Sequence, residues 1–284
     1  MNIRPDLHMH STASDGVLSP ERLVARAAQE GVTVMAITDH DSFRGVDSLQ
    51  GKAMPIPVIP GVELSIRGMK NLHLLGYGTA EATELRAKVE ELARKRETRA
   101  AQMLEKLSAL GMPLKESDIE HEGSLGRPHI ARAMVKAGYV RKMQEAFEKY
   151  LGDGKPAYVS GERLSMEEAL PLMRRNGFVP VLAHPIQLGQ DEPTLCALLK
   201  SWQEQGLMGV EVFHPSQTSH GYARLERMVR RMGFLVTGGS DFHQEDDTHG
   251  LPGCTVKDWG QAAEDLARLQ EEICNMDRSI HVDP

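Results

Sequence analysis

The chain has 284 residues, and its hydrophobic content of 40% is enough for a large buried core. There are 33 Lys and Arg against 40 Asp and Glu, so the net charge of -7 does not indicate a general nucleic-acid-binding surface. The three cysteines form no metal or redox motif, and neither an apolar signal region nor a membrane-spanning run is present, so we expect a cytoplasmic protein.

Seven short apolar segments have the pattern of buried β-strands, and helical patterns separate several of them. Alternation of strands and helices predicts a parallel α/β fold. The expected strands are residues 3–10, 32–40, 57–64, 72–77, 178–184, 209–213 and 234–238.

Capping residues mark the starts of two helices between these strands. Ser19 followed by Pro20 combines an N-cap with a first-turn proline. Ser165 followed by Glu168 has the spacing of a capping box. The expected helices are residues 20–30, 165–176, 217–232 and 260–274.

The middle of the chain breaks the alternation of strands and helices. Residues 80–110 have the pattern of one long helix, and shorter helical patterns follow at residues 128–138 and 141–151. No strand pattern occurs between residues 77 and 158. We therefore expect two parts, a helical insertion of residues 80–158 and an α/β body of residues 1–79 and 159–284.

A residue that can bind a metal lies at or near the end of each expected strand. If the strands are parallel, these ends meet at one mouth of the sheet or barrel. Imidazoles and carboxylates together suit Mn²⁺, Zn²⁺ or Fe²⁺. We expect two to three divalent ions, with Mn²⁺ first and Zn²⁺ or Fe²⁺ as alternatives. The nine candidate ligands are His8, His10, Asp15, His40, Glu63, His73, His184, Asp241 and His243.

Several candidate ligands also have an ordinary explanation. His8 and His10 point to the same side of a strand, but such a pair can simply be two surface histidines. Asp15 lies in a turn sequence, where aspartate is common. His73 could be a core histidine with a hydrogen-bond partner. Glu63 lies among apolar neighbours, where a buried carboxylate needs a partner and a metal would supply one.

Further polar residues lie beside the candidate ligands. Asp39 and Asp41 flank His40, and either could orient an imidazole. Glu211 is expected to support the metal ligands or to cap the end of its strand. His214 could contact phosphate or protonate a leaving oxygen, or it could be an ordinary loop histidine.

These residues, in this order, resemble the PHP (polymerase and histidinol phosphatase) family, within the wider amidohydrolase-like enzymes. The resemblance implies a distorted (β/α)7 barrel with a trinuclear metal site that hydrolyses phosphoesters. A hydroxide bridging two metals would attack phosphorus, and Glu63 would be a bridging ligand. The matching motifs are DLHMHS at 6–11, ITDHD at 37–41, PGVE at 60–63, AHP at 183–185 and GSDFH at 239–243.

Two motifs of the expected insertion narrow the resemblance. LGRPHIA at 125–131 and YLGDGKPAY at 150–158 are similar to a PHP subgroup of nucleotide 3′,5′-bisphosphate phosphatases and 5′→3′ exonucleases that act on short RNA. Arg127, His129 and Lys155 would together form an anion site near a helix N-terminus. We expect them to hold a 5′-phosphate that is not cleaved, although Arg127 and Lys155 could also be solvated surface cations.

The leading interpretation is therefore a phosphatase that removes the 3′-phosphate of a nucleoside 3′,5′-bisphosphate. The first alternative is a 5′→3′ exoribonuclease on short 5′-phosphorylated RNA, although an aromatic content of 5% argues against an extended stacking platform. A histidinol-phosphate-like phosphatase is disfavoured by the insertion, and a non-catalytic metal-stabilised module by nine intact ligands. We expect no membrane association and no obligate protein partner.

Overall fold

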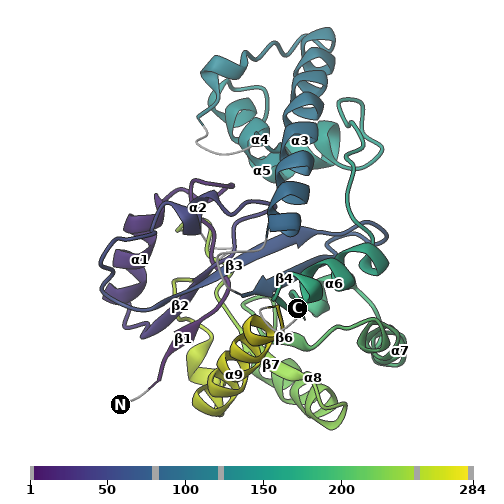
Figure 1. Ribbon diagram of the computed structural model, residues 1–284. Coiled ribbons are helices and arrows are strands. Elements are labelled where there is room, and N and C mark those ends of the chain that lie inside the picture. The colour runs from purple at the N-terminus through teal and green to yellow at the C-terminus, as the bar shows by residue number, and fades with distance from the viewer. Residues whose placement is uncertain (1–2, 79–82, 121–124, 246–249, 281–284) are drawn as a thin grey trace.

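The computed structural model describes residues 3–78, 83–120, 125–245 and 250–280, and in it the seven expected strands form one sheet in chain order (Figure 1). The N–H of Leu7 donates to the Gly238 carbonyl at 3.1 Å and that of Asp241 to the His8 carbonyl at 2.8 Å, so the first strand also meets the last. The expected distorted seven-stranded α/β barrel is confirmed. The strands are β1 (Pro5–Asp6), β2 (Val34–Ile37), β3 (Val58–Ser65), β4 (His73–Tyr77), β5 (Val179–Leu182), β6 (Gly209–Phe213) and β7 (Leu235–Gly238).

The expectation of a parallel sheet is wrong for β4. This strand pairs antiparallel with both β3 and β5, whereas the other neighbouring pairs are parallel. Only residues 66–72 join β3 to β4, which is too short for the crossover that a parallel pair needs. Because β4 runs in reverse, its first residue, His73, lies at the mouth where the parallel strands end.

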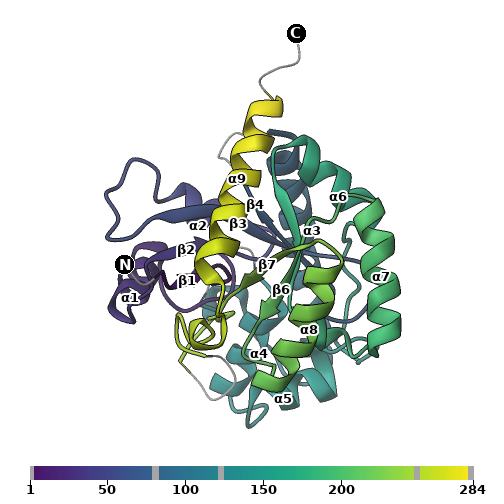
Figure 2. The ribbon, with the colours of Figure 1, turned by 90° about the horizontal axis from the view of Figure 1, so that it is seen from below.

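Helices surround the barrel strands, as the view from below shows (Figure 2). The Ser19 hydroxyl accepts a hydrogen bond from the Arg22 N–H, and Ser165 and Glu168 form the expected capping box. Two of the barrel helices were not expected, a short one at Arg44–Asp47 and a longer one at Glu192–Glu204, for which Asp191 is the N-cap. None of the helices in the described ranges is both long and apolar enough to cross a membrane. The barrel helices are α1 (Pro20–Gln29), α2 (Arg44–Asp47), α6 (Met166–Arg175), α7 (Glu192–Glu204), α8 (Ser219–Arg231) and α9 (Ala262–Ile280).

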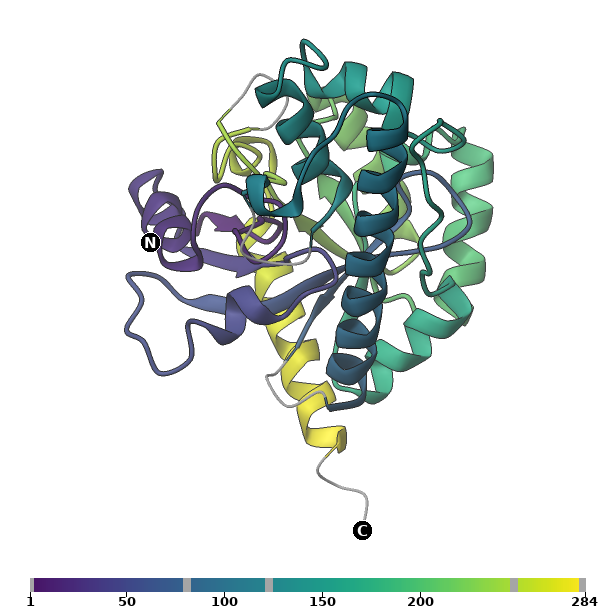
Figure 3. The same cartoon turned by 90° about the horizontal axis from the view of Figure 1, so that it is seen from above.

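The residues between β4 and α6 form helices above the mouth of the barrel (Figures 1 and 3). They have a hydrophobic cluster of their own, which includes Met103, Leu107, Ile130 and Met134. The helices of the described residues here are α3 (Thr83–Ala109), the 3-10 turn η1 (Glu116–Asp118), α4 (Arg127–Lys136), α5 (Met143–Ala146) and the π-helical turn η2 (Phe147–Leu151).

The long helix α3 belongs to both hydrophobic clusters. Leu85, Val89 and Leu92 in its first half pack into the core of the barrel. Ala100 and Met103 in its second half pack into the cluster of the insertion. This continuous helix therefore ties the insertion to the barrel. The expected boundary between residues 79 and 80 lies outside the described residues, and the division into two parts stays a prediction.

Candidate metal centre

All nine candidate ligands come together at the mouth of the barrel, and one group of four has the spacing of a metal shell. The Nε2 atoms of His8 and His10 each lie 3.2 to 3.3 Å from Oε2 of Glu63 and from Oδ1 of Asp241. A tetrahedral ion with bonds of about 2.0 Å holds its ligand atoms about 3.3 Å apart. These four atoms therefore fit the shell of one divalent ion.

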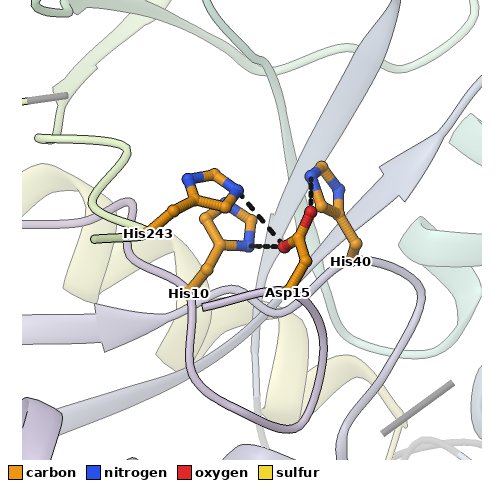
Figure 4. A group of neighbouring side chains, drawn as sticks. All are labelled: His10, Asp15, His40 and His243. Atoms are coloured by element: carbon orange, nitrogen blue, oxygen red, sulfur yellow. Dashed lines mark ion pairs between the residues drawn. The ribbon is translucent and has the colours of Figure 1, made fainter. Parts of the chain in front are cut away.

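A second group surrounds Asp15 and contains His10, His40 and His243 (Figure 4). The Nε2 atom of His243 lies 3.2 Å from Oδ1 of Asp15, and Nδ1 of His10 lies 3.9 Å from the same oxygen. The Nε2 atom of His40 lies 4.0 Å from Oδ2. The loop after β1 thus places the Asp15 carboxylate among three imidazoles.

A third group forms around Glu63 and contains His40 and His73. Oε1 of Glu63 lies 2.9 Å from Nδ1 of His73 and 3.0 Å from Nε2 of His184. Oε2 lies 2.9 Å from Nδ1 of His40 and also faces the first group. Glu63 thus belongs to two groups, as expected of a bridging ligand.

The burial of these atoms tests whether the residues suit a metal. Nε2 of His8, Nε2 of His10 and Oε2 of Glu63 are buried without a hydrogen-bond partner among the described residues. Each unsatisfied buried group costs about 1 to 3 kcal/mol, and an ion would satisfy all three. The donor set of imidazoles and carboxylates suits divalent ions. We conclude that this site binds divalent metal ions.

The buried charges shift the pKa values of one another. Burial acts to lower the pKa of His8, but Glu211, Glu63 and Asp241 outweigh it and hold this pKa well above its usual value. Burial acts to raise the pKa of Glu63, but the neighbouring imidazoles hold it well below. For His243, the nearby carboxylates overcome burial and raise the pKa to about 10. In the metal-free protein, His8 and His243 therefore carry protons that a metal must displace.

Buried carboxylates support the candidate ligands and their loops. Glu211 faces Nδ1 of His8 through Oε1 at 3.0 Å and accepts the backbone N–H of His184 at 2.7 Å. Asp39 and Asp41 hold loops rather than imidazoles. Asp39 accepts hydrogen bonds from the hydroxyls and backbone of the 11–14 turn, and Asp41 pairs with Arg96.

The backbone at the site is strained and crowded. Asp41, His184 and Asp241 have φ angles of 45°, 26° and 51°, in the left-handed region that residues other than glycine rarely adopt. A Cβ atom on Gly239 would lie 2.4 Å from Cβ of His8, so only glycine fits beside this ligand. The backbone is therefore strained at two candidate ligands, His184 and Asp241, and beside a third, His40.

His214 lies beside the first group of ligands. Its Nε2 atom is 3.2 Å from Oδ2 of Asp241, and its Nδ1 atom is 2.8 Å from the Ser216 hydroxyl. The imidazole is buried and contacts a candidate ligand directly. Its role as a proton donor to the leaving group stays a prediction.

A cavity of about 660 Å³ opens between the barrel mouth and the insertion. The candidate ligands Asp15, His40 and His73 lie along one part of its wall. All three predicted phosphate-binding residues, Arg127, His129 and Lys155, also line it, and so do three arginines that sequence analysis did not identify, Arg96, Arg99 and Arg163.

The arginines of the cavity repel one another. Burial, and then the charges of neighbouring arginines, lower the pKa values of Arg96 and Arg99 to about 10. Arg127 is paired with Asp153 at 2.9 Å, whereas the buried Nη2 atom of Arg99 has no hydrogen-bond partner among the described residues. An excess of buried positive charge with free N–H groups suits an anionic ligand.

The other two predicted phosphate-binding residues differ in their surroundings. Nδ1 of His129 accepts the backbone N–H of Gly126 at 3.0 Å, so this imidazole caps the start of α4 and is buried. Lys155 is exposed, at the turn after η2. Contact of either residue with a phosphate stays a prediction.

A nearly closed barrel with three groups of candidate metal ligands at its mouth, beside a cavity rich in arginine, is the arrangement of a metal-dependent phosphoesterase. The chain belongs to the PHP domain family, whose profile matches residues 6–153. The family and the class of enzyme expected from the sequence are thus confirmed.

Three similar proteins agree with this assignment. The chain is 33% identical to a 5′-3′ exoribonuclease of Haemophilus influenzae, over 86% of this chain and 91% of that protein. It is also 33% identical to a 3′,5′-nucleoside bisphosphate phosphatase of Chromobacterium violaceum, over 84% of this chain and 86% of that protein. A solved structure of an amidohydrolase from Chromobacterium violaceum, with bound sulfate and no metal, has a TM-score of 0.81 and 29% identity, covering 95% of this chain and 96% of that one.

Proposed function

We propose that this protein removes the 3′-phosphate of nucleoside 3′,5′-bisphosphates, with Mn²⁺ as the first candidate among the divalent ions. One observation carries the proposal, the cavity that joins metal ligands such as His73 to arginines such as Arg99 and Arg127. A bisphosphate has one phosphate for each of these two regions, whereas a monophosphate has only one. The name of the Chromobacterium violaceum phosphatase supports the same substrate class.

In this proposal, different residues bind the metal ions, bind the 5′-phosphate and donate a proton. The nine candidate ligands hold the ions, which when bound lower the pKa of water and neutralise charge on the phosphoryl oxygens. Arg127, His129 and Lys155, helped by Arg99 and Arg163, bind the 5′-phosphate that is not cleaved. His214 donates a proton to the leaving oxygen, since its Nε2 atom lies beside Asp241 at the mouth.

A second candidate function is 5′→3′ exoribonuclease activity on short 5′-phosphorylated RNA. Phe147 lines the cavity, and the guanidinium of Arg127 lies 5.9 Å from its ring centroid and 5.6 Å from that of Tyr158. Aromatic rings beside a cation favour stacked bases. The first phosphodiester of such an RNA would lie at the position of the 3′-phosphate of a bisphosphate. The similar protein from Haemophilus influenzae is named a 5′-3′ exoribonuclease, which supports this second candidate.

The deciding experiment measures product release by the Mn²⁺-loaded protein. Substrates are adenosine 3′,5′-bisphosphate, adenosine 3′-monophosphate, histidinol phosphate and a short 5′-phosphorylated RNA followed by chromatography. We expect strong preference for the bisphosphate over the 3′-monophosphate. Turnover of RNA alone would move the assignment to the exoribonuclease, and turnover of histidinol phosphate alone would exclude both nucleotide functions.

We also propose that the protein works in the cytoplasm. Its three cysteines are free, as expected where thiols are kept reduced. Fractionation of cells that express the protein, followed by immunodetection, tests this location. Recovery in the extracellular or membrane fraction would contradict it.

A further inference from the structure

Two arginines of the helical insertion donate to backbone carbonyls of candidate metal ligands. Nη1 of Arg132, in α4, lies 3.2 Å from the carbonyl oxygen of Asp15. Nη1 of Arg96, in α3, lies 3.4 Å from that of His40, and its Nη2 atom pairs with Asp41. Asp15 and His40 belong to the same group of ligands, which also contains His243 (Figure 4).

Residues of the barrel contact candidate ligands of the other two groups. Glu211 fixes the His8 imidazole and the backbone N–H of His184. The N–H of Glu63 donates to the Asp39 carbonyl at 3.2 Å, within the barrel. The support from the insertion therefore goes to Asp15, which belongs only to the second group, and to His40, which belongs to the second group and also to the group around Glu63.

These loop positions need support from outside. Asp15 lies in the turn after β1, and His40 is followed by Asp41, whose φ angle is 45°. Partners that orient metal ligands are worth about 10- to 100-fold in metal affinity. Burial lowers the pKa of Arg132 and the charge of Asp15 opposes this shift, so the cation lies within the field of that carboxylate.

We propose that Arg132 and Arg96 are positioning residues for the ion held by Asp15, His40 and His243, and that this ion binds tightly because the insertion is docked on the barrel. The insertion would then control the occupancy of one metal group as well as the binding of substrate. The inference needs the binding of divalent metal but does not depend on which phosphoester is cleaved.

Arg132 is the better residue for a test, because Arg96 lines the substrate cavity whereas Arg132 is not among its lining residues. Arg132→Met keeps the aliphatic stem and removes the donor, and Arg132→Lys keeps a cation and a donor. Arg94→Met, at an exposed position of α3, is the matched control. Metal-free proteins are dialysed against a series of Mn²⁺ concentrations, and bound metal per chain is measured by elemental analysis.

We expect Arg132→Met to bind one ion about 10- to 100-fold more weakly and the remaining ions as in the wild type. Arg132→Lys should recover part of this affinity, and Arg94→Met should match the wild type. An unchanged isotherm for folded Arg132→Met, or equal weakening of every ion, would overturn the proposal. If Arg132→Met does not fold, as judged by circular dichroism, Arg132→Lys decides by the same criterion. Since no nucleotide is present, failure of the proposed substrate assignment would not affect the result.

Discussion

The Nδ1 atom of His8 lies 3.0 Å from Oε1 of Glu211, and both side chains are completely buried. The other oxygen of this carboxylate accepts the backbone N–H of His184 at 2.7 Å. Glu211 therefore orients the ring of one candidate ligand and the backbone of another. With Nδ1 engaged, Nε2 of His8 is directed at Glu63 and Asp241.

Replacement of Glu211 by Gln should weaken metal binding by about 10- to 100-fold, because a neutral amide orients and polarises the His8 imidazole less well. The side-chain shape is kept, so the fold should survive. The measurement is the Mn²⁺ affinity of metal-free protein by equilibrium dialysis. Glu204→Gln, at an exposed position near the end of α7, serves as the control. Equal affinities for the two variants would show that Glu211 is only structural.

Among the described residues, Glu63 is the carboxylate with most imidazole neighbours, so its loss should be more severe than that of Glu211. Its two oxygens lie 2.9 to 3.3 Å from imidazole nitrogens of His8, His10, His40, His73 and His184. Glu63→Gln should lose at least one ion per chain and lower turnover by more than about 100-fold, beyond the effect of a supporting partner alone. Metal content and phosphate release are measured on the same sample. A variant that keeps both its metal and its rate would refute the bridging role.

The strands and the candidate ligands could be predicted from local sequence. Seven apolar runs gave seven strands because buried strands leave a compositional pattern. The direction of β4 could not be predicted, since a short apolar run such as residues 72–77 looks the same in either direction. His73 is nevertheless at the mouth, because the reversed strand begins where its neighbours end.

The wall of the cavity was much harder to predict. Arg96, Arg99 and Arg163 look like ordinary solvated cations in the sequence, and Arg163 lies far along the chain from the other two. Arg96 and Arg99 on α3 and Arg163 before α6 come beside Arg127 and the candidate metal ligands only in the folded chain. The one local signal was the group of four cations among residues 94–99, in which Arg96 and Arg99 share a helix face.

Arg127→Ala should raise KM for adenosine 3′,5′-bisphosphate by about 10- to 150-fold, since a charge-assisted hydrogen bond contributes about 1.5 to 3 kcal/mol. KM for adenosine 3′-monophosphate, which lacks the 5′-phosphate, should change little. Asp153→Asn should act in the opposite direction for the bisphosphate, because it releases Arg127 from its ion pair. Asp153 is 69% exposed, so this gain should stay within about 5-fold.

Steady-state kinetics on both substrates separates this role from a general one. Arg141→Ala, at an exposed position of the insertion, is the control and should behave as the wild type. If Arg127→Ala impaired both substrates equally, the residue would not bind the 5′-phosphate. If Asp153→Asn raised KM, the carboxylate would help to hold the substrate instead of competing with it.

Metal loading should become stronger as pH rises. Carboxylates keep the pKa of His8 well above its usual value and raise that of His243 to about 10, so both rings are protonated near neutral pH without metal. Mn²⁺ must displace these protons. Calorimetric titration at pH 7 in two buffers of different ionisation enthalpy should detect protons released on binding. No proton release, with an affinity independent of pH, would contradict the shifted pKa values.

The metal-free protein should show the opposite dependence in its stability. The pKa of His243 rises from its ordinary 6.5 to about 10 on folding, because Asp15 and Asp241 face it. A raised pKa stabilises the folded state fully below pH 6.5, and this contribution is lost as pH rises towards 10. In the presence of chelator, the difference in Tm between wild type and His243→Gln should therefore be largest near the acidic end of this window and should shrink as pH increases. A difference that grew with pH would mean that His243 is neutral in the folded, metal-free protein, and that its carboxylate neighbours are compensated by other groups.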